Sequence, residues 1–531
     1  MIKLPAVFCL GLLLAVPGLS WAAEAVVSGK VYQERDGKPG RGATDPGLAG
    51  VRVSNGRDIV RTAGDGSYEL PVRPGDTVFV IKPEDYRFVK AADGLPAFWH
   101  HYHPEGSPPL KYKGIAATHT PLNRYDFALQ PDRRATSDGF QMLVFTDPQT
   151  ATARDVGYYE QSIVRPLRGT RARLGTTLGD ITNDDLSLYP LLNRVTTQLG
   201  VPWFHVPGNH DLDFDAPDDA RSLDSWRAVY GPDTYAVEEG GASFVFLDDV
   251  VYDPAGTPKY VGGLRADQFA FLEGYLKGLR RDRLLVLGMH IPLFDAAPGR
   301  KTFRHADRQR LFALLRPFST VLVLSGHSHT QQHYYHGAAE GWHGDKPLHE
   351  YNVGANCGAF WSGVKAADGV PDSRMSDGTP KGYALLDVAG NGSYRLQYRV
   401  AGAPASEQIG LHAPKVLRQG AYPAWGVYAN VYMGEDRSVV QYRVDGGPWQ
   451  PMKQVRQPDP RLLLENVADD LADTLRGYDR SPEATASPHL WRGALPTSLE
   501  VGEHTVDVRA TQPDGAVFTA STRYRLQVGE P

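Results

Sequence analysis

Five mainly apolar runs of strand length, each followed within three residues by Asp, Asn or His, constrain the fold of this 531-residue chain more than any other feature. The runs begin near Met142, Thr176, Val201, Leu284 and Val321, and they alternate with helix-length amphipathic stretches. In layered α/β folds, ligands bind beyond the carboxyl ends of the strands. We therefore expect the five polar segments to converge at one edge of the central part of the chain.

The polar segments carry side chains that suit metal binding. Asn, His and Asp also occur in ordinary turns, because their side chains bond to nearby backbone. Five independent turns are not all expected to hold metal-binding combinations, however. Seven oxygen and nitrogen ligands exceed the four of a tetrahedral zinc site, so we expect two neighbouring cations that share a bridging carboxylate. The candidate ligands are Asp147, Gln149, Asp180, Asn209, His290, His327 and His329.

The order of these motifs resembles that of the calcineurin-like metallophosphoesterases. The likeness rests on Asp-x-Gln, Gly-Asp, Gly-Asn-His-Asp, a single His after a strand, and Gly-His-x-His, and it covers residues 138–400. It implies an α/β central domain, a β-sandwich with flanking helices in four αββα layers. It also implies that His210 is the general acid and that Asp211 orients it. One metal would take Asp147, Gln149, Asp180 and His329; the other would take Asp180, Asn209, His290 and His327.

The charges of such a centre suit the hydrolysis of phosphate esters. Two divalent ions bring about +4, while Asp147, Asp180 and a bridging hydroxide bring about −3, so a residual charge near +1 attracts a phosphate oxygen. The metals also make hydroxide available near neutral pH, and His210 can protonate the leaving oxygen. We therefore expect a metal-dependent phosphoric ester hydrolase that works by metal-activated hydroxide attack. The residues do not distinguish a phosphomonoesterase from a phosphodiesterase.

Gln149 bears on the identity of the two divalent metal ions. Many members of the family have His where this chain has Gln149. An amide oxygen is a neutral and harder ligand than imidazole, which shifts the preference towards Mn or Mg relative to Zn. We favour Mn, with Fe, Zn and Mg as alternatives.

An alternative reading of the same sequence is an envelope binding protein that kept the fold and lost catalysis. Its flanking β modules would then perform its function. The complete ligand set together with His210 argues against this reading. Metal content separates the two, because a lapsed site would bind less transition metal than the chain requires for catalysis.

The first residues have the pattern of a secretory signal peptide. Lys3 is followed by an apolar stretch from Leu4 to Leu19 and then by Ser20-Trp21-Ala22. We predict a signal peptide over 1–22, cleaved after Ala22 or, as a second choice, after Ala25, and a periplasmic or secreted protein; the alternative is an uncleaved membrane anchor, which the shortness of the stretch and its Pro17-Gly18 disfavour. No later segment is long and apolar enough for a transmembrane span. Of the two cysteines only Cys357 would remain after cleavage, so no internal disulfide could form.

Two all-β sandwich domains are expected on either side of the central domain at 138–400. Residues 24–130 contain short alternating strands separated by turn signals such as Asn55-Gly56. Residues 405–531 show the same alternation, which is typical of an immunoglobulin- or fibronectin-like sandwich. Both modules resemble those that flank the phosphoesterase domain in bacterial exported members of the family.

The partner should be a phosphate ester and not a nucleic acid. The net charge is −5, and no dense stripe of Lys and Arg is present. A place in the cell envelope makes lipid head groups, nucleotides and glycan phosphates candidate substrates. Asn356, Phe360 and Trp361 follow a predicted strand at 350–353 and could reach the rim of the pocket, with packing in the core as the alternative.

Overall fold

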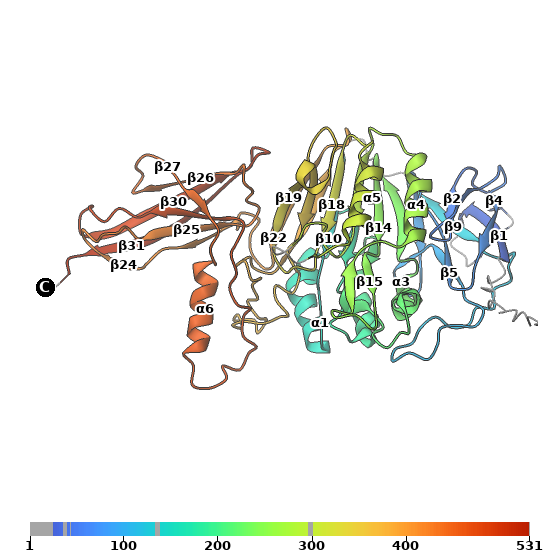
Figure 1. The fold of residues 1–531 in the computed structure, drawn as a ribbon, viewed down its shortest axis with the longest axis horizontal. Helices are drawn as coiled ribbons and strands as arrows, with labels where there is room; N and C mark the ends of the chain where they lie inside the picture. The colour runs from blue at the N-terminus through green and yellow to red at the C-terminus, as the bar shows by residue number, and fades with distance from the viewer. Residues whose placement is uncertain (1–24, 36–39, 43, 133–138, 296–300, 530–531) are drawn as a thin grey trace, which may run out of the picture.

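The structure, a computed structural model, describes residues 25–35, 40–42, 44–132, 139–295 and 301–529. The predicted signal peptide over 1–22 lies outside them. The chain forms an elongated arrangement with the N-terminal strands at one end, the helix-containing part in the middle and the C-terminal strands at the other end (Figure 1). In the described part of the chain, no helix combines the length and the apolarity needed to cross a bilayer.

The N-terminal module is built from two facing sheets. Its strands alternate as the sequence predicts: Tyr68, Leu70 and Val72 are buried, and the residues between them are not. The first sheet has the order β4 (Ser67–Val72), β1 (Ala25–Gln33), β9 (Phe127–Pro131), β6 (Tyr86–Lys90) and β7 (Pro96–Ala97). The second has the order β3 (Ile59–Arg61), β2 (Arg52–Ser54), β5 (Asp76–Val80) and β8 (Trp99–Tyr102).

The central domain holds two larger sheets that contain the five apolar runs. One has the order β12 (Trp203–Val206), β11 (Leu174–Leu178), β10 (Phe140–Phe145), β21 (Gly382–Val388) and β22 (Tyr394–Val400). The other has the order β13 (Thr234–Glu239), β14 (Ala242–Leu247), β17 (Leu284–Gly288), β18 (Val321–Ser325), β20 (Leu348–Asn352) and β19 (Gln332–His336). A small hairpin joins β15 (Val250–Tyr252) to β16 (Tyr260–Gly262).

Parallel pairing explains why the five strands read as continuous apolar runs. Strands β10, β11 and β12 pair in parallel, as do β14, β17, β18 and β20. Parallel strands are covered on both faces, so every residue of β11, β17 and β18 is buried. Neighbouring parallel strands also end at the same edge of their sheet, which delivers the polar segments to one place.

Helices flank the two central sheets and complete the four predicted layers (Figure 1). The α/β central fold and the two mostly β flanking domains are therefore confirmed. The helices are α1 (Ala153–Tyr159), α2 (Tyr189–Thr196), α3 (Asp224–Tyr230), α4 (Ala266–Lys277) and α5 (His305–Leu315). Short helical turns are η1 (Glu160–Val164), η2 (Arg165–Leu167), η3 (Leu186–Leu188), η4 (Thr197–Leu199), η5 (Asn209–Asp211), η6 (Asp219–Arg221) and η7 (Ala338–Glu340).

The C-terminal domain is a second sandwich of two sheets. One has the order β23 (Ile409–His412), β25 (Gly426–Val431), β29 (Leu490–Ala494) and β28 (Lys453–Val455). The other has the order β24 (Val416–Arg418), β31 (Val517–Gln527), β30 (Gly502–Thr511), β26 (Val439–Val444) and β27 (Gln450–Pro451). One helix, α6 (Pro460–Asp470), projects from this domain beside the junction with the central domain (Figure 1).

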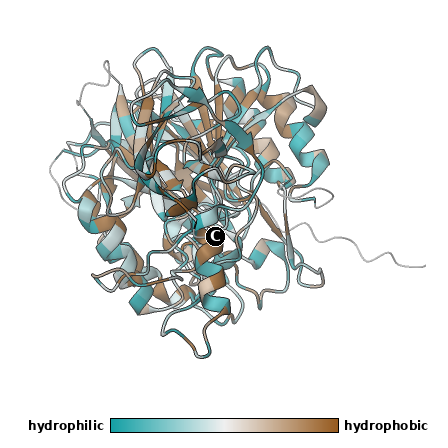
Figure 2. Ribbon diagram, turned by 90° about the vertical axis from the view of Figure 1, so that its left-hand side faces the viewer, coloured by the Kyte–Doolittle hydropathy of each residue, from teal (hydrophilic) through white to brown (hydrophobic). Residues whose placement is uncertain are grey.

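The buried apolar residues form two separate cores. The first runs without a break from the N-terminal module into the central domain, where Phe79 lies 6.1 Å from Phe271. The second belongs to the C-terminal domain and includes Val427, Trp491 and Val508. Figure 2, a view along the long axis, shows hydrophobic residues concentrated in the inner strands and hydrophilic residues on outer loops. The predicted boundaries at 24–130, 138–400 and 405–531 remain predictions.

Candidate metal centre

Side chains from the ends of four strands meet at one buried point. Asp180, His290 and His327 each offer a ligand atom, and these atoms lie within 4.8 Å of one another. Nε2 of His290 is 3.2 Å from Oδ2 of Asp180 and 3.2 Å from Oδ1 of Asn209. Strands β11 and β12 come from one central sheet, and β17 and β18 come from the other. The predicted convergence therefore takes place between the two sheets.

The remaining candidate ligands lie beside this group. Oδ1 of Asp147 is 3.4 Å from Nε2 of His329. The backbone N–H of Gln149 donates to the backbone carbonyl of Asp180 at 2.9 Å. Oδ1 of Asp147 and Oε1 of Gln149 are both buried and have no hydrogen-bond partner among the described residues. A buried oxygen without a partner is costly, whereas a bound cation satisfies it. The side chains present thus fit divalent metal ions.

The carboxylates of the site favour positive charge at His290. Burial alone lowers the pKa of His290, yet the carboxylate of Asp180 outweighs it and raises that pKa to about 10. The other ring nitrogen, Nδ1, lies 2.8 Å from the carbonyl of Leu178 and donates to it. Such a bond orients a metal-binding histidine and leaves Nε2 for the metal. A cation that binds here replaces the proton, so binding and deprotonation are coupled.

The backbone of the site is strained. Asp147, Gln149, Asp180, His327 and His329 all have positive φ values, between 39° and 69°. For residues other than glycine this left-handed region costs about 1–3 kcal/mol each, and it persists where the surrounding structure dictates it. Positive φ values therefore mark five of the seven candidate ligands independently of their side-chain chemistry.

Two glycines of the motifs allow the close approach of a carboxylate. A Cβ atom on Gly208 would lie 2.2 Å from Oδ1 of Asp180, and one on Gly326 would lie 2.7 Å from Oδ2 of Asp147. Both distances are shorter than any real contact of a Cβ atom. The glycine that begins each of these two motifs is thus part of the geometry that holds the two carboxylates.

His210 lies at the exposed edge of this buried group. Its backbone N–H donates to Oδ1 of Asp180 at 2.8 Å, and Nδ1 of its ring lies 2.8 Å from Oδ1 of Asp184. The His210 side chain is 27% exposed. Burial lowers its pKa, but Asp180 and Asp184 outweigh this and leave the pKa raised above its ordinary value. The ring is therefore placed as a proton donor, beside carboxylates that favour its protonated form.

The predicted role of Asp211 as the partner of His210 is corrected by the structure. The carboxylate of Asp211 accepts from the backbone of Ile181 and Gly208 at 3.2 and 2.9 Å, and from the hydroxyl of Tyr189 at 2.9 Å. It thus stabilises η5 and the loop after β11. Asp184 instead occupies the position that orients the His210 ring. Neither its separation from His210 in the sequence nor its residue type indicates this role.

Asp249 is a second supporting carboxylate, which the sequence analysis does not predict although its position after a strand indicates it. Asp249 follows β14 in the same way as the other polar residues follow their strands. Its Oδ1 accepts from the backbone N–H of His290 at 3.0 Å, and its Oδ2 accepts from that of Ile291 at 2.9 Å. Asp249 therefore fixes the turn that presents His290.

The three predicted substrate contacts have different surroundings. Phe360 is 56% exposed, and its ring stacks on His329 with centroids 4.9 Å apart. Trp361 is buried, and its Nε1 donates to the carbonyl of Pro148 at 2.9 Å. Asn356 is also buried and donates from Nδ2 to the carbonyl of Gly382 at 2.7 Å. Phe360 alone of these three presents an open face beside the candidate ligands.

The chain matches family models of known proteins over most of its length. Three family models match successive stretches: the N-terminal domain of calcineurin-like phosphoesterases at 38–113, the calcineurin-like phosphoesterase domain at 176–331 and the C-terminal domain of calcineurin-like phosphoesterases at 350–518. The chain belongs to the calcineurin-like phosphoesterases. This calcineurin-like phosphoesterase is a metal-dependent phosphoester hydrolase, and its family implies two divalent metal ions. The central match contains Asp180 and His329, whereas Asp147 precedes it.

Solved structures show weaker likenesses. A purple acid phosphatase, PPD1, from yellow lupin (Lupinus luteus) seeds has 12% identity and a TM-score of 0.38, with 67% of each chain covered. A dimetal phosphatase from Danio rerio has 15% identity and a TM-score of 0.33, with 49% of this chain and 98% of that chain covered. Neither likeness is close enough to support a conclusion about this chain. No curated protein matches it.

Proposed function

We propose that this phosphoesterase is an exported, manganese-dependent enzyme that hydrolyses small phosphate esters, with His210 as the proton donor to the leaving group. The observation that carries the proposal is the pairing of a partly exposed His210 with Asp184 at the edge of a buried ligand group. A donor at that edge can reach the leaving oxygen of an ester whose phosphate lies against the ligands.

The metal ions and the side chains of the site have different roles in the reaction. Two bound divalent ions supply the chemistry that makes water nucleophilic near neutral pH and stabilises charge on the phosphate oxygens. His210 donates a proton from Nε2 to the departing oxygen, while Asp184 holds the ring by Nδ1 and favours its protonated form. General acid catalysis of this kind contributes about 10²–10⁴-fold to the rate.

Phe360 supports a role in holding the organic part of the substrate. Its exposed ring lies on the solvent side of His329, where a sugar, a base or a head group could pack. Aromatic faces contribute such contacts without directional hydrogen bonds. Lipid head groups, nucleotides and glycan phosphates therefore remain the substrate candidates, and Phe360→Ala should raise KM more than it lowers kcat for esters with large organic groups.

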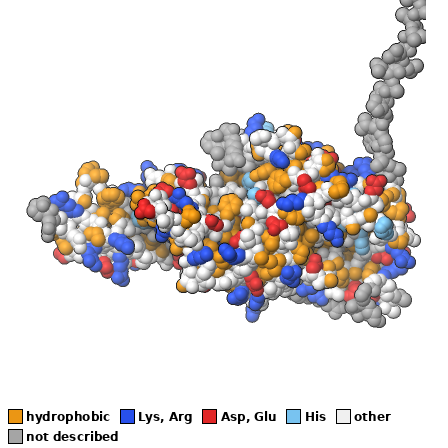
Figure 3. Space-filling view, turned by 90° about the horizontal axis from the view of Figure 1, so that it is seen from below, with side chains coloured by type: hydrophobic (Ala, Val, Ile, Leu, Met, Phe, Trp, Pro, Cys, Tyr) orange, Lys and Arg blue, Asp and Glu red, His pale blue; other side chains and the backbone are white. Residues whose placement is uncertain are grey.

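The charge of the surface fits a small ester better than a long polyanion. Figure 3 shows basic and acidic side chains interspersed over the face seen from below, without a continuous basic stripe. A nucleic-acid groove normally shows clustered Lys and Arg along the track of the backbone. Local positive charge would thus come from the metals.

A substrate panel tests the proposed activity. Purified protein, stripped of metal and then reloaded separately with Mn, Fe, Zn or Mg, is assayed with p-nitrophenyl phosphate, bis-p-nitrophenyl phosphate, nucleotides and phospholipid head-group esters. The expected result is turnover of one ester class, with Mn giving the highest rate. A chain that binds metal stoichiometrically and turns over no ester would instead identify an envelope binding protein.

Export is tested separately. The full-length chain is expressed in a bacterium, the cells are fractionated, and the N-terminus of the product is determined by mass spectrometry. We expect the product outside the cytoplasm with Ala23 as its first residue. An intact Met1 in the cytoplasmic fraction contradicts this part of the proposal and leaves the activity untouched.

A further inference from the structure

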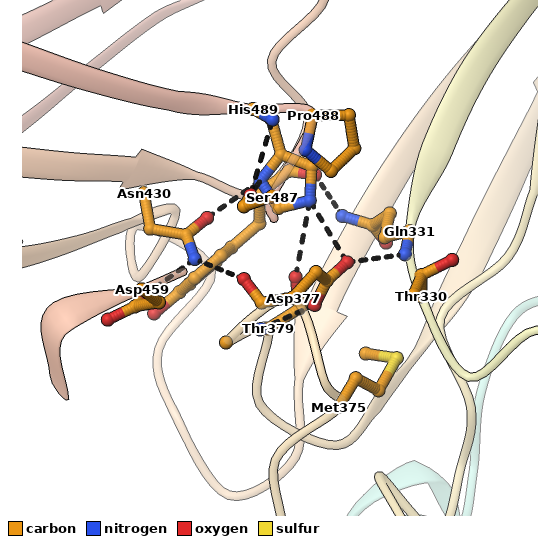
Figure 4. A network of polar contacts seen from close by, with 12 residues as sticks. Thr330, Gln331, Met375, Asp377, Thr379, Asn430, Asp459, Ser487, Pro488 and His489 are labelled. Carbon is orange, nitrogen blue, oxygen red and sulfur yellow. Dashed lines mark hydrogen bonds and ion pairs between the residues drawn. The ribbon is translucent and has the colours of Figure 1, made fainter. Parts of the chain in front are cut away.

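The chain segment after His329 is held by residues that come from two domains. The backbone N–H of Gln331 donates to Oδ2 of Asp377 at 2.7 Å, in a loop of the central domain (Figure 4). The side chain of Gln331 is buried between two tyrosines. Its Oε1 accepts from the hydroxyl of Tyr351 at 2.8 Å, and its Nε2 donates to the backbone carbonyl of Tyr432 in the C-terminal domain.

Asp377 is in turn fixed by the C-terminal domain. Nε2 of His489 lies 3.2 Å from Oδ2 of Asp377, the same oxygen that accepts from Gln331 (Figure 4). Nδ1 of His489 lies 2.7 Å from Oδ1 of Asn430, and Nδ2 of Asn430 donates to Oδ2 of Asp459 at 2.7 Å. These side chains form a continuous buried network, which we call the junction network: Gln331, Asp377, Asn430, Asp459 and His489.

The junction network joins two domains through buried polar groups, which lose their hydration on burial. Most of the apolar core of the C-terminal domain is separate from that of the other described residues, and only Tyr432 and Met433 of this domain join the first core. A buried polar network is no better than apolar packing for stability, but when all its members are paired it fixes one geometry. Polar groups at this junction thus point to a need for precise placement of what they contact.

What the network contacts is the segment that follows a candidate metal ligand. Gln331 lies two residues after His329, whose φ of 46° is in the left-handed region. A strained conformation of this kind persists only where surrounding groups dictate it. Nδ1 of His329 is 3.9 Å from Sγ of Cys357, a long contact that fixes the ring weakly. The backbone on its C-terminal side is held by the bonds of Gln331 and by Asn352, whose Nδ2 donates to the carbonyl of Thr330 at 3.0 Å.

We propose that the C-terminal domain sets the geometry of the metal centre, with His489 as a positioning residue that acts through Asp377 on the Gln331 segment. The inference rests on the assignment of His329 as a metal ligand. It gives the C-terminal domain a part in metal binding, although no residue of that domain is a candidate ligand.

Metal affinity is the property that separates positioning from simple stability. Two variants test it: His489→Ala removes the ring, and Asp377→Asn preserves size but replaces an acceptor of the Gln331 N–H. His504→Ala is the matched control, because His504 lies in the same domain and bonds only within it, to Asp445 and to the carbonyl of Glu500. Each full-length protein is titrated with Mn²⁺ by equilibrium dialysis, with folding checked by circular dichroism.

The expected result is a loss of affinity for one of the two Mn²⁺ ions. Residues that support metal ligands typically contribute about 10–100-fold to metal affinity, and we expect about tenfold for this more distant network. The second ion should bind as in the wild type, and high Mn²⁺ should restore kcat. Should His489→Ala fail to fold, Asp377→Asn carries the test alone.

Two outcomes would overturn the inference in different ways. Folded variants with both Mn²⁺ affinities equal to those of the wild type and of His504→Ala contradict the positioning role, while the metal centre itself stands. A wild-type protein that binds no Mn²⁺, Zn²⁺, Fe²⁺ or Mg²⁺ contradicts the assignment of the metal centre and removes the basis of the inference with it.

Discussion

Nδ1 of His210 and Oδ1 of Asp184 lie 2.8 Å apart, and the Asp184 carboxylate comes from the loop that begins with the candidate ligand Asp180. The same loop therefore supplies a carboxylate to the metal centre and another to the proton donor. This places the acid at a fixed position relative to the ligand group, since His210 also donates its backbone N–H to Asp180.

Replacing His210 with Ala should reveal its role through the leaving group. We expect kcat to fall by about 10²–10⁴-fold for alkyl phosphate esters, whose departing oxygen needs a proton. The loss should be much smaller for p-nitrophenyl esters, because p-nitrophenolate leaves without one. Steady-state kinetics with both ester types and metal analysis of the variant provide the check. Equal losses for the two leaving groups would remove His210 from the acid role.

Replacing Asp184 with Asn should change the pH dependence of the reaction. Asp184 helps to raise the pKa of His210, so its removal lowers that pKa. An acid acts only while protonated, and the alkaline limb of kcat/KM against pH should therefore move to lower pH. Asp184 is 53% exposed, so screening by solvent keeps the shift small. Asp282→Asn, which removes another exposed carboxylate, should leave the profile unchanged.

The correction at Asp211 predicts an effect on stability. Asp211→Ala leaves the N–H groups of Ile181 and Gly208 and the hydroxyl of Tyr189 without their acceptor. Each unpaired buried donor costs about 1–3 kcal/mol, so the free energy of unfolding should fall by several kcal/mol. Tyr189→Phe removes one of these bonds and should cost about 1 kcal/mol. Urea unfolding of metal-free protein measures both, and equal costs would contradict the arrangement.

Adding one methyl group at Gly326 should damage metal binding. The Cβ atom of Gly326→Ala would lie 2.0 Å from Oγ1 of Thr146 and 2.7 Å from Oδ2 of Asp147, so the Asp147 carboxylate must move. We expect a loss of Mn²⁺ affinity of tenfold or more, by analogy with groups that orient ligands (about 10–100-fold). Gly157→Ala, in an open position of α1, is the control and should bind Mn²⁺ normally.

His205 should make the fold sensitive to acid. Burial lowers its pKa to about 3, whereas an unfolded chain has a histidine pKa of about 6.5. Below about pH 6.5 the unfolded chain binds the extra proton and the folded chain does not, so stability falls as the pH falls towards 3, by up to about 1.4 kcal/mol per pH unit. His205→Phe should lack this part of the slope in urea unfolding measured at pH 7, 6 and 5. Identical slopes for wild type and variant would contradict it.

The central fold and the candidate ligands could be predicted because buried parallel strands leave a readable pattern. Each of the five runs is mainly apolar and ends shortly before its polar residues begin, so chain order alone places the ligands at strand ends. The same rule applies to Asp249 after β14, and a consistent use of it would have found that residue.

The residues that surround and position the candidate ligands could not be predicted in the same way. Asp184 reaches His210 because its own φ is 65°, a backbone conformation that the local sequence does not specify. Phe360 and Trp361 are adjacent aromatics with φ values of 54°, and only the three-dimensional turn decides that the first is open and the second buried. His489 meets Asp377 across 112 positions of sequence, a separation over which no local pattern carries information.

The place of His489 far to the C-terminal side of His329 has a consequence for biosynthesis. A ribosome makes the N-terminal module and the central domain first, so the segment around His329 emerges long before its partners Asn430 and His489. A nascent or truncated chain would therefore contain the strand ends but lack the residues that position His329. Tight metal binding would then follow synthesis of the C-terminal domain, and proteolytic loss of that domain would weaken metal binding without removing a ligand.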